Sequence, residues 1–372
     1  MKNITIGVHS SEEYIGGVYN MLSSFGIGLH DAFLAKNLDI KYIDEWVKEN
    51  KMPHFSVGFS FSGFNFWHDI LKNQMFNIMW AVDSVFYNNV EIIDKYRSCL
   101  TFSCICLSDD DEEAINYFMP DLQRITLPLA IDPKLWYSDN TERPKDIVFL
   151  ASIQDPDEII AEAKPFLIRG KDQTLYHIFM DMYNYALSHP DQNFWQIFNK
   201  FDLFKRYDNT KYKAYSFFLQ KLTYAVSYKK RIELVSSLSD FNIEVYGNGP
   251  WKKFLKSNAK HMGSVDLIDA IEVLKNSKIA INLQPMQILN GIHDRIMNSS
   301  AAGCLVFTDK NKMIYDSYGD SLCYFDPKDF SGFAEQIRYY LENDKEREIK
   351  VKAAQEITLR DHTWKNRADA LI

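Results

Sequence analysis

The feature that most constrains the fold is an alternation of short apolar runs with stretches of helical periodicity. This alternation is typical of parallel strands joined by right-handed crossover helices. It predicts an N-terminal Rossmann-like α/β domain over residues 1–140. The strands expected there are ITIGVH (4–9), HFSVGFSF (54–61), FNIMWAV (76–82), SCICLS (103–108) and RITLPLA (124–130).

The alternation resumes after a polar segment that contains a proline, residues 136–146, where we place the linker. It predicts a second doubly wound α/β domain over residues 141–355. An almost wholly helical stretch, residues 157–239, interrupts that domain as an insertion. The strands expected around it are DIVFLAS (146–152), NIEVYG (242–247), IAINLQP (279–285) and GCLVFTD (303–309).

Charge and hydropathy exclude several classes of protein. The net charge is -8, and no segment has the Lys/Arg excess that nucleic acid requires, so we expect no nucleic-acid partner. No run of 18 apolar residues occurs and the N-terminus soon becomes polar, which predicts a cytoplasmic protein without a transmembrane segment. Peripheral membrane contact stays open. The five cysteines are an odd number without metal-binding spacing, so we interpret them as buried thiols.

The densest polar cluster is residues 290–309, at a predicted strand end where ligands of open parallel sheets bind. Asn290 and Gly291 can form a tight turn, and the helix that follows would point its amide donors and positive dipole end at that turn. Arg295 offers donors suited to phosphate oxygens, and Asn298, one turn on, suits a ribose hydroxyl. In the structural alternative, Asp294 caps the helix and pairs with Arg295, and Asn298 is solvated.

The order of several motifs resembles group 1 glycosyltransferases, particularly the CgeB-like branch. The Arg-bearing helix is followed by Ala302-Gly303-Cys304 and LVFTD, then by YFDPKDFSGFAEQIRYYLEND (324–344) and a closing DHTWKNRADAL (361–371). Upstream, FNIMWAVDS (76–84) and RITLPLAIDPKLW (124–136) are similar to segments of the same branch. The resemblance implies a GT-B fold, with two Rossmann-like domains facing across a cleft and a C-terminal helix, residues 356–372, crossing back to the first.

The resemblance also implies a function. We expect a glycosyltransferase that moves a sugar from a nucleotide-sugar donor to a hydroxyl of a glycan, lipid or protein acceptor, without cofactor or catalytic metal. The alternatives are a nucleotide-sugar binding protein without turnover and a GT-B nucleotide-sugar epimerase. Where the family often has a ribose-binding Glu, this chain has Asn298, or Asp294 one turn earlier. The donor-binding residues expected are Gly16, Gly17, Tyr246, Gly247, Asn248, Asn290, Gly291, His293, Asp294, Arg295 and Asn298.

Two residues are catalytic candidates. Asp83 follows an apolar strand, where it is either a helix cap or a base aimed into the cleft that takes the acceptor hydroxyl proton. His9, at the end of the first strand, could contact the donor or be structural. The acidic run 109–113 follows Ser108, which favours the start of a helix over a metal site.

Overall fold

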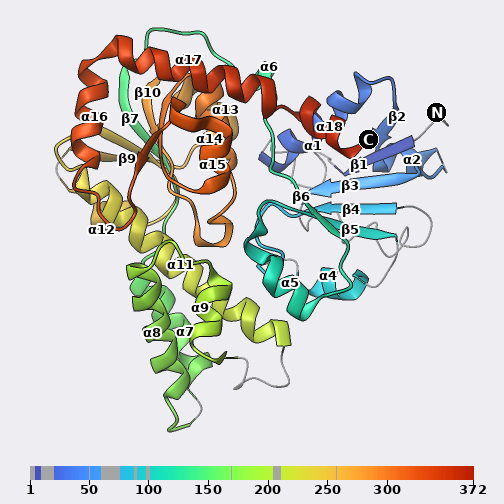
Figure 1. Cartoon of the computed structure of the whole chain (residues 1–372), viewed down its shortest axis with the longest axis horizontal. Coiled ribbons are helices and arrows are strands. Elements are labelled where there is room, and N and C mark those ends of the chain that lie inside the picture. Colours follow the sequence, from blue (N-terminus) through green and yellow to red (C-terminus); the bar gives the residue numbers. More distant parts are fainter. Residues whose placement is uncertain are drawn as a thin grey trace. The chain divides into compact units, whose positions relative to one another are not determined.

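The computed structural model describes residues 5–9, 21–49, 51–59, 76–87, 90–97, 101–168, 170–203, 211–256 and 258–372. These residues form two compact units (Figure 1). Unit 1 comprises Met1–Leu135, Ile292–Asp294 and Leu359–Ile372, and unit 2 comprises Trp136–Gly291 and Arg295–Thr358.

Unit 1 contains a parallel six-stranded sheet in the order β2-β1-β3-β4-β5-β6. Its strands are β1 (Thr5–His9), β2 (Asp39–Tyr42), β3 (Phe55–Phe59), β4 (Phe76–Trp80), β5 (Phe102–Cys106) and β6 (Arg124–Thr126). Five of these strands were predicted. The sequence DIKY of β2 was missed because only Ile40 in it is buried, which leaves no apolar run to detect.

The helices of unit 1 flank this sheet. They are α1 (Met21–Leu34), α2 (Ile43–Lys48), α4 (Val90–Tyr96), α5 (Glu112–Phe118), α6 (Pro133–Trp136) and α18 (Trp364–Leu371), with a 3-10 turn η2 (Asp109–Asp111). Ser108 caps η2 by accepting a hydrogen bond from the backbone of Asp110. The helix-start interpretation of the acidic run is therefore confirmed.

The C-terminal helix α18 completes the core of unit 1. Trp364 is buried, with its ring centroid 5.7 Å from that of Phe25, 5.4 Å from Phe59 and 5.6 Å from Trp80. It packs where α1 carries Gly28, since a Cβ at that position would lie 2.2 Å from the indole. The glycine therefore provides the space that the tryptophan occupies.

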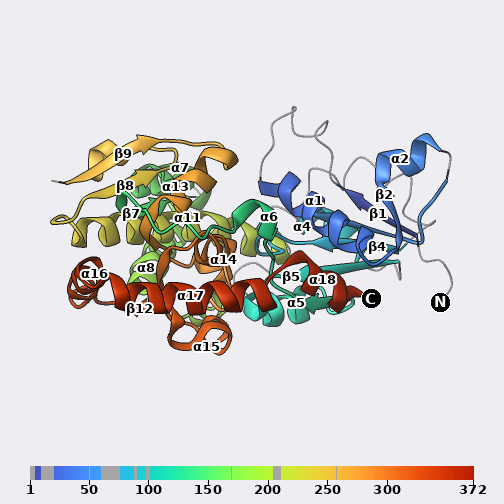
Figure 2. The ribbon, with the colours of Figure 1, turned by 90° about the horizontal axis from the view of Figure 1, so that it is seen from above.

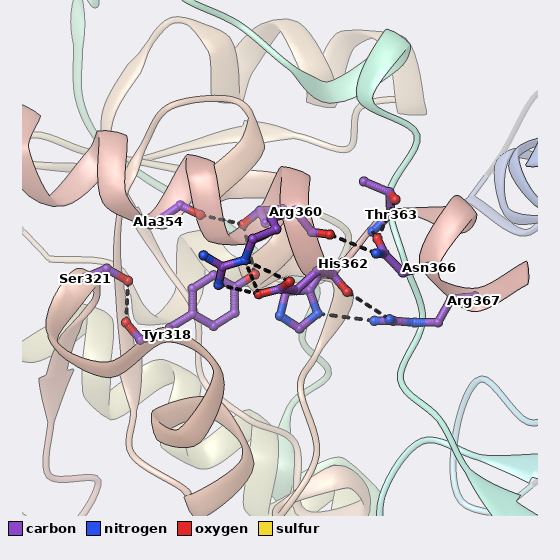
Figure 3. A network of polar contacts seen from close by, with 10 residues as sticks. Tyr318, Ser321, Ala354, Arg360, His362, Thr363, Asn366 and Arg367 are labelled. Atoms are coloured by element: carbon purple, nitrogen blue, oxygen red, sulfur yellow. Dashed lines mark hydrogen bonds and ion pairs between the residues drawn. The ribbon is translucent and has the colours of Figure 1, made fainter. Parts of the chain in front are cut away.

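Backbone contacts also attach α18 to the segment after β6. The backbone N–H of Ile131 donates to the His362 carbonyl at 2.9 Å, and Arg367 donates to the carbonyls of Pro128 at 2.8 Å and Leu129 at 2.9 Å. Figure 3 shows Arg367 reaching the buried His362 ring, 3.2 Å away. Burial, and next the Arg367 charge, lower the pKa of His362 to about 4, so this histidine is neutral at neutral pH.

Unit 2 contains a second parallel six-stranded sheet, in the order β12-β11-β10-β7-β8-β9. Its strands are β7 (Lys145–Leu150), β8 (Ile243–Tyr246), β9 (Ala259–Gly263), β10 (Ser277–Ile281), β11 (Leu305–Asp309) and β12 (Cys323–Phe325). This is the Rossmann order, in which the direction of winding reverses between the first strand, β7, and the fourth, β10. Ligands of such sheets bind at the carboxyl ends of the strands near that reversal.

The helices of unit 2 cover its sheet and form the predicted insertion. The insertion contains α7 (Pro156–Leu167), α8 (Thr174–Ser188), α9 (Phe194–Lys200) and α11 (Lys211–Ser237). The others are α12 (Trp251–Phe254), α13 (Leu267–Lys275), α14 (Asp294–Ala301), α15 (Lys312–Tyr318), α16 (Phe333–Glu342) and α17 (Asp344–Asp361), with 3-10 turns η3 (Met286–Ile288) and η4 (Gly319–Ser321). Figure 2 shows α17 leading the chain from α16 to α18.

The cysteines that the structure describes are buried thiols. Cys104, Cys106, Cys304 and Cys323 are free and buried, as predicted, whereas Cys99 lies outside the described residues. Burial raises the pKa of Cys304 to about 12, which makes this thiol unreactive.

Within the ranges given above, no helix is both long enough and apolar enough to cross a bilayer.

Candidate functional site

Buried polar side chains gather at the carboxyl ends of β10 and β11. The side-chain amide of Asn282 donates to Thr308 Oγ1 at 3.0 Å and to Gln284 Oε1 at 3.1 Å. The backbone N–H of Gln284 donates to Asp309 Oδ1 at 2.8 Å. All four residues are buried, and each is hydrogen-bonded to another member of the group. We call Asn282, Gln284, Thr308 and Asp309 the strand-end cluster.

The strand-end cluster holds the loop that leads into α14. The Gly291 carbonyl accepts one hydrogen bond from Gln284 Nε2, at 2.6 Å, and another from Asn311 Nδ2, at 2.7 Å. Asn311 also donates to the Leu289 carbonyl at 2.9 Å and caps α15 through its side-chain oxygen. The predicted Asn290-Gly291 turn is therefore fixed from two sides, which gives the start of α14 a defined position.

Arg295, in the first turn of α14, belongs to the same network, because its Nη1 donates to Asn282 Oδ1 at 3.1 Å. Asn298, one turn later, is only 3% exposed, so the alternative in which it is merely solvated is wrong. In unit 1, His293 Nδ1 lies 2.7 Å from Asp294 Oδ1, and Asp294 begins α14. Contact of these residues with a donor stays a prediction.

After the neighbouring strands β7 and β8, Gly247 allows the two strand-end loops to approach each other closely. Gly247 has φ +149°, and a Cβ there would lie 2.3 Å from the Ala151 carbonyl oxygen. The backbone N–H of Asn248 donates to Ser152 Oγ at 2.9 Å, which joins the two strand-end loops. The Tyr246 hydroxyl contacts Glu244 and accepts from Lys145 Nζ at 3.1 Å, so its polar end is already occupied. Their contact with a nucleobase stays a prediction.

In unit 1, the catalytic candidates belong to strands of one sheet. His9 is the last residue of β1, and the half-buried Asp83 follows β4. Gly16 and Gly17 lie outside the described residues. Directly after Asp83, Ser84 Oγ and the Val85 N–H each donate to Asp111 at 2.8 Å. Sequence reasoning missed Asp111 because an acidic run at a helix start is normally exposed, whereas this carboxyl group is buried.

Comparisons with known proteins give a family match for part of the chain and structural matches for nearly all of it. Residues 229–372, less than half of the chain, match a family described as Glycosyl transferase-like. No curated protein sequence matches significantly. Among solved structures, sucrose-phosphate synthase from Thermosynechococcus elongatus has a TM-score of 0.55 at 10% identity, covering 99% of this chain and 97% of that one.

Two further structures are similar over the same length. T4 phage β-glucosyltransferase has a TM-score of 0.55 at 11% identity, and an α-glucosyltransferase in complex with UDP-glucose and DNA has 0.59 at 10%. Each covers 99% of this chain and 98% of its own. The fold is GT-B. The predicted fold class is thereby confirmed.

In unit 1, the carboxyl group of Asp111 is buried, which is unusual for an acidic side chain. Burial, with a smaller contribution from the charges of Asp110 and Asp83, raises its pKa to about 7 against the opposing effect of the Ser84 and Val85 hydrogen bonds. Because the folded pKa lies above the ordinary value of 3.8, the folded state binds the extra proton between these values. Ionisation of Asp111 therefore costs stability as pH rises.

We predict that Asp111→Asn removes a pH dependence of stability. The wild type should lose a few kcal/mol of unfolding free energy between about pH 4 and 7 because of this group, whereas the neutral variant should not. Calorimetric unfolding of both proteins at pH 5 and pH 8 measures the difference. Asp109→Asn, an exposed change on the same turn, is the control and should retain the wild-type dependence. Equal pH dependence in wild type and Asp111→Asn would contradict the prediction.

Within the part of the chain that the structure describes, no group of three or more His, Cys, Asp or Glu side chains is placed to hold a metal ion.

Proposed function

We propose that the protein is a glycosyltransferase, related to the CgeB-like branch, that moves a sugar from a nucleotide sugar to a hydroxyl of a glycan, lipid or protein. The observation that carries this proposal is the match of residues 229–372 to a glycosyl transferase-like family. That segment contains the strand-end cluster and α14, which bears Arg295. The GT-B fold supports the proposal, as does UDP-glucose in one similar structure.

In this proposal the donor diphosphate lies at the start of α14. The unsatisfied N–H groups of a helix N-terminus and its positive dipole end favour a phosphate. Arg295 adds charge-assisted hydrogen bonds, and its contact with Asn282 holds the guanidinium in place before the donor binds. These groups would stabilise the departing nucleotide, so we propose that transfer needs no divalent metal.

Asp83 would supply the base in this mechanism. It would accept the proton of the acceptor hydroxyl while that oxygen attacks the anomeric carbon and the bond to the donor phosphate breaks. The proton ends on the Asp83 carboxylate, and the nucleotide leaves as an anion beside Arg295. The acceptor is a glycan, lipid or protein rather than DNA, because the net charge of -8 opposes binding to a polyanion.

Incubation with a panel of nucleotide sugars tests this function. A transferase should slowly release one free nucleotide by donor hydrolysis, and should do so equally in EDTA. A silent binding protein would give a melting shift without release, and an epimerase would give a new nucleotide sugar without free nucleotide. If no nucleotide shifts the melting temperature, the proposed function is wrong. Loss of turnover in EDTA that manganese restores would overturn metal independence.

We predict that Arg295→Ala weakens nucleotide affinity by about tenfold to a hundredfold, since a charge-assisted hydrogen bond contributes about 1.5–3 kcal/mol. Titration calorimetry with the nucleotide identified above measures the change. Arg338→Ala is the matched control, because it removes an exposed arginine of the same unit, on α16. Unchanged affinity in Arg295→Ala would give the arginine a purely structural role.

A further inference from the structure

A pocket of about 560 Å³ lies in unit 2 at the carboxyl ends of β11 and β12, beside the loop between α8 and α9 of the insertion. Its size falls in the range of small-molecule sites. We call it the β11–β12 pocket; its lining includes Asp309, Lys310, Asn311, Tyr324 and Lys328. A smaller adjoining pocket shares Asp309 and Leu289 with it and is also lined by Ser227 of α11. Of the expected donor-binding residues, Asn290 lines the β11–β12 pocket, whereas Arg295 and Asn298 line neither pocket.

The charges around the β11–β12 pocket do not suit an anion. Lys328 Nζ lies 2.7 Å from a carboxylate oxygen of Asp191, and Lys310 Nζ lies 3.6 Å from the ring centroid of Tyr315. Both lysines are therefore engaged by groups of the protein. Asp309 adds a buried carboxyl group, which would repel a phosphate. A neutral ligand fits this electrostatic environment better than a nucleotide does.

The remaining lining suits a ligand with many hydroxyl groups and apolar C–H faces. The carboxyl group of Asp309 accepts hydrogen bonds. The side-chain oxygen of Asn311 can accept one more, whereas both of its amide hydrogens already bond the carbonyls of Leu289 and Gly291. Between these polar groups, Leu289 and Pro327 provide apolar surface. A sugar ring has both properties, because its hydroxyls lie at the ring edge and its C–H groups on the ring faces.

Ser227 points independently to a ligand. The residue is 8% exposed, and among the described residues its hydroxyl has no hydrogen-bond partner. Leaving a buried hydroxyl unsatisfied is costly unless a ligand or water supplies a partner. Thr223, one turn earlier on α11, has the same unpartnered state but lines neither pocket. The two residues therefore form a matched pair for a test.

We propose that the β11–β12 pocket and its smaller neighbour form a binding site for a neutral sugar unit, with Asp309 and Ser227 bonding its hydroxyls. The site would hold part of a saccharide separate from the donor nucleotide. It would give the helical insertion a function, since the α8–α9 loop and α11 provide one wall. Binding at this site needs no turnover, so it can be tested whether or not transfer occurs.

The test is saturation-transfer NMR with glucose, galactose and N-acetylglucosamine on the full chain. At least one sugar should bind the wild type, and Ser227→Ala should weaken it several-fold without lowering the melting temperature, because the change removes an unsatisfied hydroxyl. Thr223→Val should leave sugar binding unchanged. Leu289→Trp should abolish binding, since Leu289 is half-buried and lines both pockets.

Three results would overturn the site. These are no binding of any of the three sugars, equal binding by wild type and Leu289→Trp, and displacement of the bound sugar by UDP, which would place the sugar in the donor site. Release of free nucleotide from the donor that persists in Ser227→Ala and Leu289→Trp would mean that the proposed function stands even where this site fails. Loss of nucleotide binding in Arg295→Ala with sugar binding intact supports two separate sites.

Discussion

Asp83→Asn is expected to cut sugar transfer by roughly 100-fold to 10,000-fold while leaving nucleotide affinity unchanged. A positioned proton acceptor contributes about this much to a rate, and the amide cannot take the proton. The cap alternative does not apply, because Asp83 lies in a bend and the next described helix, α4, begins only at Val90. The measurement is the transfer rate at saturating donor, with nucleotide affinity determined in parallel.

The control for this prediction is Asp109→Asn, since Asp109 follows the neighbouring strand β5 and is exposed. It should keep the wild-type rate. The turn that carries Asp83 is held by Asp111 through Ser84 and Val85, so Asp111→Ala should lower the rate through misplacement of that turn. A wild-type transfer rate in Asp83→Asn would exclude Asp83 as the base.

The strands and the GT-B class could be predicted because apolar periodicity is a local property of the sequence. Seven of the nine strands expected from apolar runs begin and end within three residues of the structure. The other two, β6 and β10, end at Thr126 and Ile281, each four residues earlier than the expected RITLPLA and IAINLQP. The pattern fails where burial is set by tertiary contacts. In β2 only one side chain is buried, and in the acidic run the buried Asp111 is indistinguishable by type from the exposed Asp109.

The position of the candidate site could be predicted from the sequence, but the hydrogen bonds that hold it together could not. The turn before α14 and the helix itself follow from glycine and polar residues at a strand end. However, nothing in the spacing of Asn282, Gln284 and Asp309 indicates that they hold that turn, because the hydrogen bonds join residues up to 26 positions apart. The role of Ser227 could not be predicted either, since a serine within a helical pattern does not indicate an adjoining pocket.

Three of the motifs that carried the family resemblance share a structural basis in unit 1. The strand FNIMWAV supplies Trp80, the segment RITLPLA supplies the carbonyls of Pro128 and Leu129, and DHTWKNR supplies Trp364 and Arg367, which bind them. Such residues would recur together because they pack together. Their presence therefore supports the fold more directly than it supports any particular donor or acceptor.

Trp364→Ala is accordingly expected to destabilise unit 1 by about 3–5 kcal/mol, the usual cost of deleting a buried large aromatic side chain. The change empties the space between Gly28 and the rings of Phe25, Phe59 and Trp80. Urea unfolding followed by fluorescence and calorimetry measures the loss. Lys365→Ala, on the exposed side of α18, should cost less than 1 kcal/mol.

A second variant separates packing from loss of the helix. Gly28→Leu leaves Trp364 intact but fills its place, because even a Cβ at that position would lie 2.2 Å from the indole, so it should also lower stability by more than 1 kcal/mol. Because both variants disturb the packing of α18 in the core of unit 1, both should destabilise the same unfolding transition. Stability equal to wild type in either variant would mean that α18 does not contribute to the core of unit 1, and the structural explanation of the closing motif would then be wrong.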